Sequence, residues 1–331
     1  SGQHEDDHAD QDRRYQERLR RSSESGPPAA AATPEDVRAD VVRRFVEFAD
    51  DQIRDKNYNA ASTETYRLKT DDPRLDVRAT AALLTSFRSW FDAFWAGRVE
   101  LDPSAAPSRI YLFWSYYKYN QLFSGKERFD EFRTTGHYRG YLDTIVVHTD
   151  GTPTADLADV LVLEAAHQLV TNRLLGDGAT PSPWVSEGLA EYFAYTRQNG
   201  DGTFDTGAIG PKSVWPFRSG KPSRSGMARG RRDAAVNRFK KSDEWSVDDL
   251  VRATPTQFYG SAVQANYGAA WLLVHFLFHG EDGLHADPFA RWLRAEAPGG
   301  PPASSLYEAL GTDAAGLDAA YRRYASKLKV R

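Results

Sequence analysis

Two side chains capable of acid–base or metal chemistry lie in an otherwise apolar stretch. Glu164 and His167 sit among Leu, Val and Ala in ADLADVLVLEAAHQLVTNRLL, residues 155–175. A helix that is apolar on nearly every side is a buried helix. A buried acid and a buried imidazole must be hydrogen-bonded, paired or bound to a ligand. The stretch therefore predicts a site; the alternative is that Glu164 and His167 simply hydrogen-bond each other or nearby backbone groups.

A second helix is predicted shortly downstream. Gly176 is a favoured terminator for the first helix, and Pro183 suits the first position of the next, where its missing N–H is not needed. That helix contains WVSEGLAEY, residues 184–192, with Glu187 and Glu191 on one face. The two helices together carry the acids and the imidazole of the predicted site.

The segments EAAHQ at 164–168 and WVSEGLAEY at 184–192 resemble the zinc-peptidase pattern His-Glu-x-x-His with a Glu on a following helix. This pattern is similar to that of the gluzincin clan of metallopeptidases, and in particular to the bacterial DUF1570 family. The resemblance runs from about Ile110 to the C-terminus. It implies an α+β fold that is zincin-like (gluzincin-like), with a small mixed β-sheet, an active-site helix pair and a helical C-terminal half.

The same resemblance implies roles for individual residues. His167 and Glu187 take the positions of zinc ligands, and Glu164 takes the position of the base that activates water. Glu191 corresponds to an acid that braces a ligand His. Tyr267, which opens YGAAWLLVHFL at 267–277, corresponds to a donor that stabilises the oxyanion, although it also suits an ordinary core position.

One position departs from this pattern, because Leu163 stands where the first ligand His belongs. Catalytic zinc usually keeps three protein ligands and one open position. Loss of a residue that only supports a ligand lowers metal affinity by about 10–100-fold, so loss of a ligand should have at least that effect. We therefore expect no cofactor or weakly bound zinc. The sequence predicts a proteolytically inactive pseudopeptidase that serves as a peptide- or protein-binding or structural module.

Other interpretations remain open. An active zinc endo- or aminopeptidase would need a replacement ligand from His148, Asp159 or a partner chain, or a Leu163 that is not natural. His275 and His279 have the i, i+4 spacing of a metal pair, but an imidazole also suits the C-terminal end of a helix. A third hypothesis is an anion-binding scaffold acting through the basic segment 218–241.

In the zinc peptidases that the sequence resembles, the strand just before the site helix forms the sheet edge along which an extended peptide lies, so the resemblance implies such an edge here. We assign this edge to Thr144, Ile145, Val146, Val147 and His148.

The composition of the chain excludes several classes of protein and of site. The net charge of −4 argues against a generally basic nucleic-acid binder, and the absence of Cys excludes disulfides and thiolate metal sites. No apolar run reaches the ~20 residues of a membrane helix. The Ser-Gly start indicates a processed or engineered terminus, and a removed targeting segment would favour a soluble extracytoplasmic protein.

The charged, apolar-poor residues 1–32 predict a disordered tail or linker. The family resemblance implies one gluzincin-like domain at residues 33–331. Within it we distinguish an N-terminal α/β part at 33–150, the helix pair at 151–199, a basic loop insertion at 200–245 and a helical part at 246–331. Outside the helix pair, helices are expected at 33–53, 75–95, 116–123, 267–279, 288–297, 302–310 and 313–329. Strands are expected at 63–70, 109–114 and 144–148, with one more just before 144.

Overall fold

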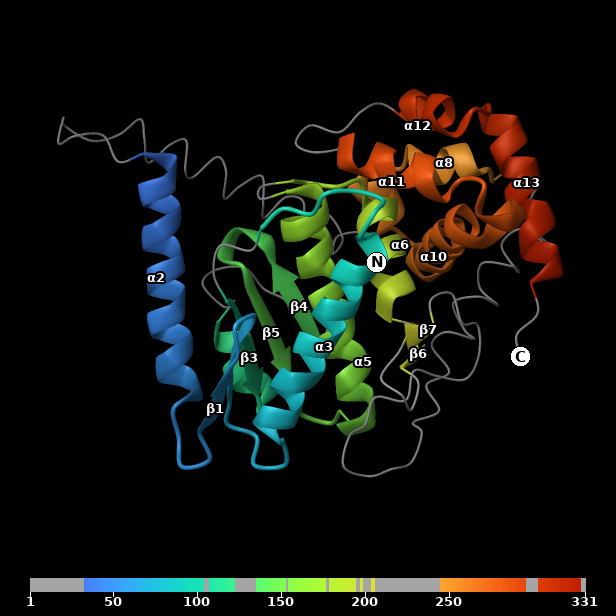
Figure 1. Ribbon diagram of the computed structural model, residues 1–331. Helices are drawn as coiled ribbons and strands as arrows, with labels where there is room; N and C mark the ends of the chain where they lie inside the picture. Colours follow the sequence, from blue (N-terminus) through green and yellow to red (C-terminus); the bar gives the residue numbers. More distant parts are fainter. Residues whose placement is uncertain are drawn as a thin grey trace.

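The computed structural model describes residues 33–103, 107–122, 135–152, 154–176, 179–194, 197–198, 204–205, 245–295 and 303–328. A β-sheet packs against helices on both faces, and the C-terminal helices gather beyond one end of it (Figure 1). The predicted α+β class is confirmed. The predictions for the tail 1–32 and for the basic segment 218–241 lie outside the described residues.

Five strands form the main sheet in the order β1-β2-β3-β5-β4. Their bounds are β1 Asn59–Ser62, β2 Tyr66–Thr70, β3 Ser108–Phe113, β4 Gly136–Arg139 and β5 Thr144–His148. The three central strands are parallel, whereas β1 and β4 pair antiparallel to their neighbours. The predicted small mixed sheet is therefore present, with β1 as an additional strand.

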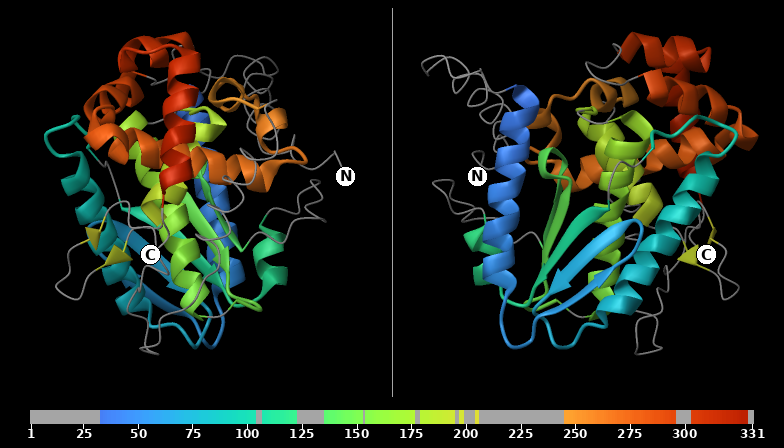
Figure 2. Two further views of the ribbon diagram at one scale, coloured as in Figure 1. Left: turned by 90° about the vertical axis from the view of Figure 1, so that its right-hand side faces the viewer. Right: turned by 60° about the vertical axis from the view of Figure 1, so that its left-hand side comes forward.

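Each face of the sheet is covered by a different pair of helices (Figure 2). One face packs against α2 (Pro34–Ile53) and α4 (Tyr116–Gln121) through Tyr111, Phe113 and Val146. The other face packs against α3 (Val77–Trp95) and α5 (Thr154–Leu169) as part of the main core. This alternation follows from the pleat, which points successive side chains to opposite faces.

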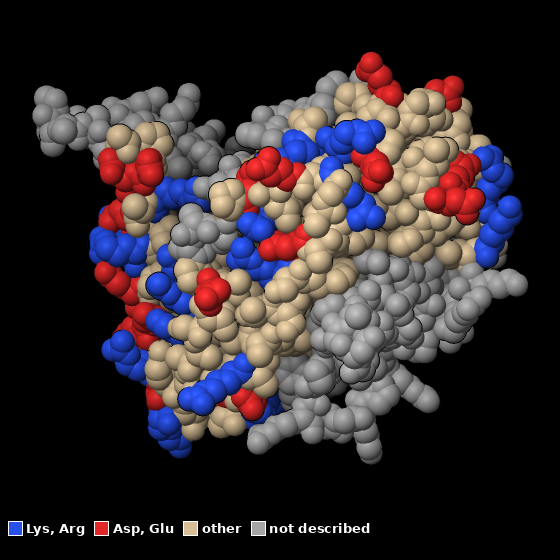
Figure 3. Space-filling model, in the orientation of Figure 1, with Lys and Arg blue, Asp and Glu red and all other residues tan. Residues whose placement is uncertain are grey.

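Local signals account for the starts of several helices. Thr33 and Asp36 form a capping box at α2, and the Asp76 side chain accepts from the first turn of α3. The charged face of α2 carries ion pairs such as Arg43–Asp40, and Figure 3 shows Lys and Arg mixed with Asp and Glu there. No field of a single sign therefore extends over this helix.

The site helix departs from its predicted form after Leu169. It continues as a π-helix, η2 (Val170–Leu175), before Gly176, whose φ is 96°. Within η2, Asn172 donates to Asp143 at 2.7 Å, so the wider turn places a polar side chain against the β4–β5 connection, which contains η1 (Gly140–Leu142). Such π segments often occur near functional sites.

The second helix of the pair and the C-terminal helices complete the core. Helix α6 (Pro183–Ala194) packs against α10 (Val263–His279), which begins earlier than predicted. The remaining elements are β6 Arg197–Gln198, β7 Phe204–Asp205, α8 Val247–Val251, α9 Pro255–Phe258, η3 Gly280–Gly283, α11 Ala286–Ala295, α12 Ala303–Leu310 and α13 Ala314–Lys327. None of the described helices combines the length and apolarity that a membrane crossing requires.

Gly188 allows the close approach of α6 and α10. A Cβ at this position would lie 2.8 Å from the Ala270 carbonyl oxygen and 2.9 Å from Val274 Cγ2. Because the nearest atom belongs to a helix backbone, Gly188→Ala should lower the free energy of unfolding by about 1–3 kcal/mol. Urea unfolding would measure this. Gly140→Ala is the matched control, since its nearest contact would be 3.7 Å away; equal effects of the two variants would contradict the packing argument.

Asp72 holds the ends of β2 and β5 together. Its side chain is fully buried and accepts from Arg74 at 2.6 Å and from the Thr149 hydroxyl at 2.5 Å. Burial opposes ionisation, but these hydrogen bonds hold the pKa of Asp72 below its ordinary value. The stabilisation is therefore present above the unfolded-state pKa and is lost as pH falls through the folded-state value.

Asp72→Asn should consequently lower the free energy of unfolding by about 1–3 kcal/mol at neutral pH. On acidification to about pH 3, the free energy of unfolding of this variant should fall by less than that of the parent protein. Urea unfolding at the two pH values measures both effects. Asp51→Asn, at an exposed position, is the control. A parallel acid response of Asp72→Asn and the parent protein would rule out this role for the carboxylate.

Candidate functional site

The two predicted site helices bring His167 and Glu187 into direct contact. His167 Nε2 lies 3.4 Å from Glu187 Oε2, and both side chains are largely buried. The other ring nitrogen, Nδ1, lies 3.2 Å from the Ser186 hydroxyl oxygen. Both nitrogens of His167 on α5 are thus engaged by consecutive residues of α6.

Glu187 also accepts a hydrogen bond that the sequence did not predict. The Tyr259 hydroxyl donates to Glu187 Oε1 at 2.8 Å. Tyr259 is the C-cap of α9, whose N-terminus has a capping box formed by Thr254 and Gln257. The Thr-Pro-x-Gln pattern was the available signal for this helical turn, although it does not reveal where the tyrosine points.

Glu164 is bonded to the sheet rather than to His167. It is buried, and its Oε2 accepts from the backbone N–H of Tyr138 in β4 at 2.7 Å. The sheet order places β4 outermost and β5 between β3 and β4. The prediction that Thr144–His148 forms the edge strand is therefore wrong. An apolar run does not distinguish an inner strand from an edge strand, and the short, more polar β4 supplies the edge.

Packing of α5 on β4 is close at this edge. A Cβ at Gly136 would meet Val147 Cγ2 at 2.6 Å and Val160 Cγ1 at 3.2 Å, so glycine is needed there. The Tyr138 hydroxyl reaches Asn172 of η2 at 2.8 Å. The outer strand is thus joined to the site helix through a backbone N–H and through a side chain.

The cluster has unusual ionisation. Burial raises the pKa of Glu164 to about 7, against the opposing influence of His167 and the Tyr138 N–H. Burial lowers the pKa of His167, but the nearby carboxylates, Glu187 foremost, outweigh it and raise that pKa to about 9. Burial also raises the pKa of Tyr259, which stays a neutral donor. At neutral pH the His167 imidazolium therefore donates toward both α6 side chains.

The other predicted site residues lie around this centre. Glu191 is 2% exposed, and its carboxylate is near enough to favour protonation of His167. Tyr267 is half-buried, and its ring packs against Phe258 and Tyr259, with centroids 5.8 and 6.3 Å apart. Tyr259, which the sequence analysis did not single out, is thus a tyrosine that is hydrogen-bonded to Glu187.

The other candidate metal ligands were His148, Asp159, His275 and His279. His148 lies on the α2 side of the sheet, where its ring packs on Tyr116 and Tyr119 at 5.0 and 5.1 Å, so the sheet separates it from α5. Asp159 is half-buried, two helical turns before His167. His275 and His279 lie elsewhere, near the Tyr324 and Tyr192 hydroxyls respectively.

The residues present do not fit a three-ligand zinc centre. Leu163, one turn before His167, is half-buried and packs against the main core. The two remaining ligand candidates, His167 and Glu187, contact each other, and Glu187 is also bonded to Tyr259. In the described part of the chain, no three His, Cys, Asp or Glu side chains are grouped so as to hold a metal ion.

The order Ser186–His167–Glu187 has the residue types of a nucleophilic triad, but its charge state argues against that chemistry. A general base must be uncharged to accept the serine proton. With a pKa of about 9, His167 already carries its proton at neutral pH. Instead, the protonated His167 on α5 donates hydrogen bonds to Ser186 and Glu187 on α6, and we call this arrangement the clamp.

Comparison with known proteins gives a single assignment at the level of family. No curated protein matches the chain. Residues 157–297, from α5 through α11, match the family model described as "Protein of unknown function (DUF1570)", which supports that family for the part of the chain carrying the site, as the sequence resemblance predicted.

Proposed function

We propose that this protein is a degenerate, zincin-like pseudopeptidase: a metal-free, proteolytically inactive module that serves in peptide or protein binding or in a structural role. The former ligand positions would act as a hydrogen-bonded clamp between α5 and α6.

The observation that carries this proposal is the direct contact between the two ligand-position side chains. His167 and Glu187 are 3.4 Å apart, and Leu163 offers no donor atom at the third position. A catalytic zinc ion would need three protein donors arranged around it. A protonated imidazole can instead supply the positive charge that neutralises the buried carboxylate.

The position of Glu164 gives independent support. As a general base it would need to reach a metal-bound water. Its Oε2 instead accepts the N–H of Tyr138 in the outer strand β4, the strand on which an extended peptide would otherwise pair. Peptide binding at this edge would require Glu164 to release that N–H.

The test combines metal analysis with a protease assay on the full chain. After purification without chelators and dialysis against zinc-free buffer, elemental analysis should find well below one zinc per chain. With zinc added, hydrolysis of casein and of a mixed fluorogenic peptide pool should not exceed the rate of a matched Glu164→Gln variant. Stoichiometric zinc that resists dialysis, or hydrolysis that Glu164→Gln abolishes, would overturn the proposal.

A further inference from the structure

Three arginines lie in one row across the main sheet. Arg67 of β2 pairs directly with Arg109 of β3. Thr144 of β5 pairs with Arg109 on one side and with Arg139 of β4 on the other. Directly paired residues share a face of a sheet, so the row crosses four adjacent strands on one face. With strands about 4.8 Å apart, it extends over roughly 14 Å.

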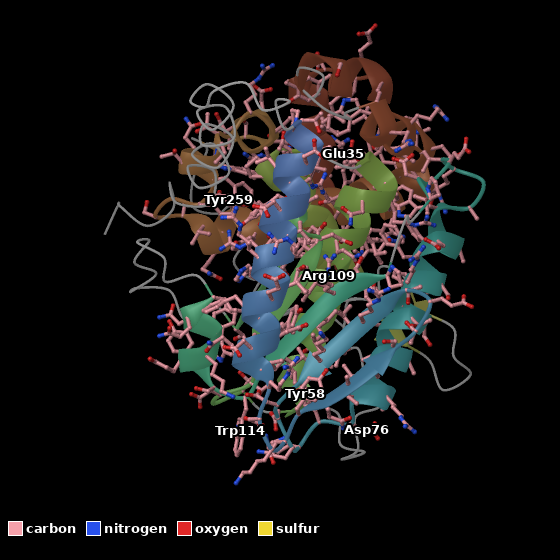
Figure 4. All side chains as sticks on the ribbon, turned by 90° about the vertical axis from the view of Figure 1, so that its left-hand side faces the viewer. Glu35, Tyr58, Asp76, Arg109, Trp114 and Tyr259 are labelled. Carbon is pink, nitrogen blue, oxygen red and sulfur yellow. The ribbon has the colours of Figure 1, made fainter. Side chains whose placement is uncertain are left out.

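The row lies on the face of the sheet that packs against α2. Tyr111 and Val146 belong to the core cluster on that face. Arg109 and Thr144 precede them by two positions in β3 and β5, and side chains along a strand alternate between the two faces. Figure 4 views the molecule from this side and shows Arg109 beside α2. The row therefore faces α2 rather than α3 and α5.

A fourth arginine approaches the row from α2. Arg38 Nε donates to the Tyr141 carbonyl oxygen at 3.2 Å, and Arg109 Nη1 donates to the Leu142 carbonyl oxygen at 3.0 Å. These carbonyls belong to consecutive residues of η1, so the two guanidinium groups are anchored within one turn of each other. Arg139 directly precedes η1 as its N-cap. We call the set Arg38, Arg67, Arg109 and Arg139 the arginine cluster.

The two central arginines of the cluster lack a counter-ion in the described part of the chain. Arg67 is exposed and Arg109 is half-buried, and neither forms an ion pair with a described residue. The Asp143 carboxylate lies on the opposite side of the sheet, where it accepts from Ser108 at 2.8 Å and from Asn172 at 2.7 Å. Like charges directly opposite each other on neighbouring strands are destabilising. An anion bound between the two guanidinium groups would remove this repulsion.

The net charge at the cluster is positive over the described residues. Lys69, further along β2, is neutralised by Asp50 of α2 at 2.5 Å. Glu35 at the start of α2 and Glu64 between β1 and β2 are the exposed acids close in sequence to the cluster. Two solvated carboxylates against four arginines leave an excess of positive charge, which attracts anions.

We propose that the arginine cluster binds an oligophosphate, a ligand that carries two or more linked phosphate groups. A guanidinium group presents a planar fork of N–H donors that matches two phosphate oxygens. A single phosphate would meet only one neighbouring pair such as Arg67 and Arg109, whereas linked phosphates reach over more than one strand spacing.

The confinement of the positive charge favours a compact ligand over a nucleic acid. A nucleic acid needs basic groups along an extended path of its backbone. The charged face of α2 is instead of mixed sign, since Arg43 pairs with Asp40 and Glu47. The proposal does not depend on the site between α5 and α6, so the failure of one leaves the other standing.

The experiment is isothermal titration of the full chain with sodium tripolyphosphate. Arg67→Gln should raise the Kd by about tenfold or more, as expected for the loss of one charged hydrogen-bonding group. Arg109→Lys keeps the charge but removes the fork, and it should also weaken binding. Arg78→Gln is the matched control, because Arg78 is exposed on α3, on the other face of the sheet, and its loss changes the net charge equally. Its Kd should equal that of the parent protein.

Titration with ATP distinguishes two sources of linked phosphates. An affinity equal to that of tripolyphosphate assigns the phosphate chain alone, and a higher affinity that Arg67→Gln still lowers assigns a nucleotide. Both affinities should fall as sodium chloride is raised from roughly 0.1 to 0.5 M.

The proposal is overturned if neither tripolyphosphate nor ATP binds, if Arg67→Gln binds both as the parent protein does, or if Arg78→Gln weakens binding as much as Arg67→Gln. It is equally overturned if a single-stranded oligothymidylate binds more than about tenfold tighter than tripolyphosphate, which would make the cluster a nucleic-acid contact. Circular dichroism verifies that each variant is folded. Because Arg67 is exposed, Arg67→Gln keeps the test decisive even if Arg109→Lys does not fold.

Discussion

Leu163→His should raise the zinc affinity of the protein by at least about 100-fold. The introduced imidazole would lie one helical turn before His167, on the same side of α5. Glu187 is already positioned next to His167, at 3.4 Å. Three donors would then surround one point, and a zinc ion could replace the proton that now separates the imidazole from the carboxylate.

Competition with a chromophoric chelator would give the affinity, and elemental analysis the stoichiometry, which should approach one zinc per chain. Leu163→Asn is the matched control, because it removes the apolar side chain without supplying an imidazole. A second control adds His167→Ala to Leu163→His and should abolish the gain. If Leu163→His takes up no more zinc than Leu163→Asn, the two helices do not retain the geometry of a metal site.

His167→Ala should be among the most destabilising single substitutions in the chain, lowering the free energy of unfolding by about 3–5 kcal/mol. The substitution removes the positive charge from a site that also contains Glu164, Glu187 and Glu191. Glu187 would keep its hydrogen bond from Tyr259 but would be left as a buried carboxylate without a counter-ion. Urea unfolding at neutral pH measures the change.

A double-mutant cycle separates the charge effect from the loss of packing. Adding Glu187→Gln to His167→Ala should restore about 1–3 kcal/mol of the free energy of unfolding. The buried charge on residue 187, which has lost its counter-ion, is then removed, while the Tyr259 hydroxyl keeps an acceptor. Arg43→Ala is the control for an exposed ion pair, since Arg43 is 59% exposed beside Asp40 and Glu47, and it should cost less than about 1 kcal/mol. Additive effects at His167 and Glu187 would show that the clamp is not a coupled pair.

Local signals in the sequence were sufficient to place most secondary structure. The capping pattern at Thr33 marks the start of α2, and the apolar periodicity of the helix predicted at 75–95 matches α3, a helix with one buried face. Such features depend on contacts within a few residues and so can be recognised in an isolated segment. The same holds for the composition of the site, since Glu164, His167 and Glu187 stand out as polar residues in apolar helices.

Only the tertiary structure decided how these side chains are used. The order in which strands pair depends on contacts between segments far apart in the sequence, so the apolar strand β5 was mistaken for the edge that β4 forms. Tyr259 reaches Glu187 across 72 residues, and Glu164 binds a backbone N–H 26 residues away. A backbone donor has no signature in the sequence, because every residue except proline carries one. The residue types thus came from the sequence, while their partners were set by the packing of α5, α6 and the outer strand.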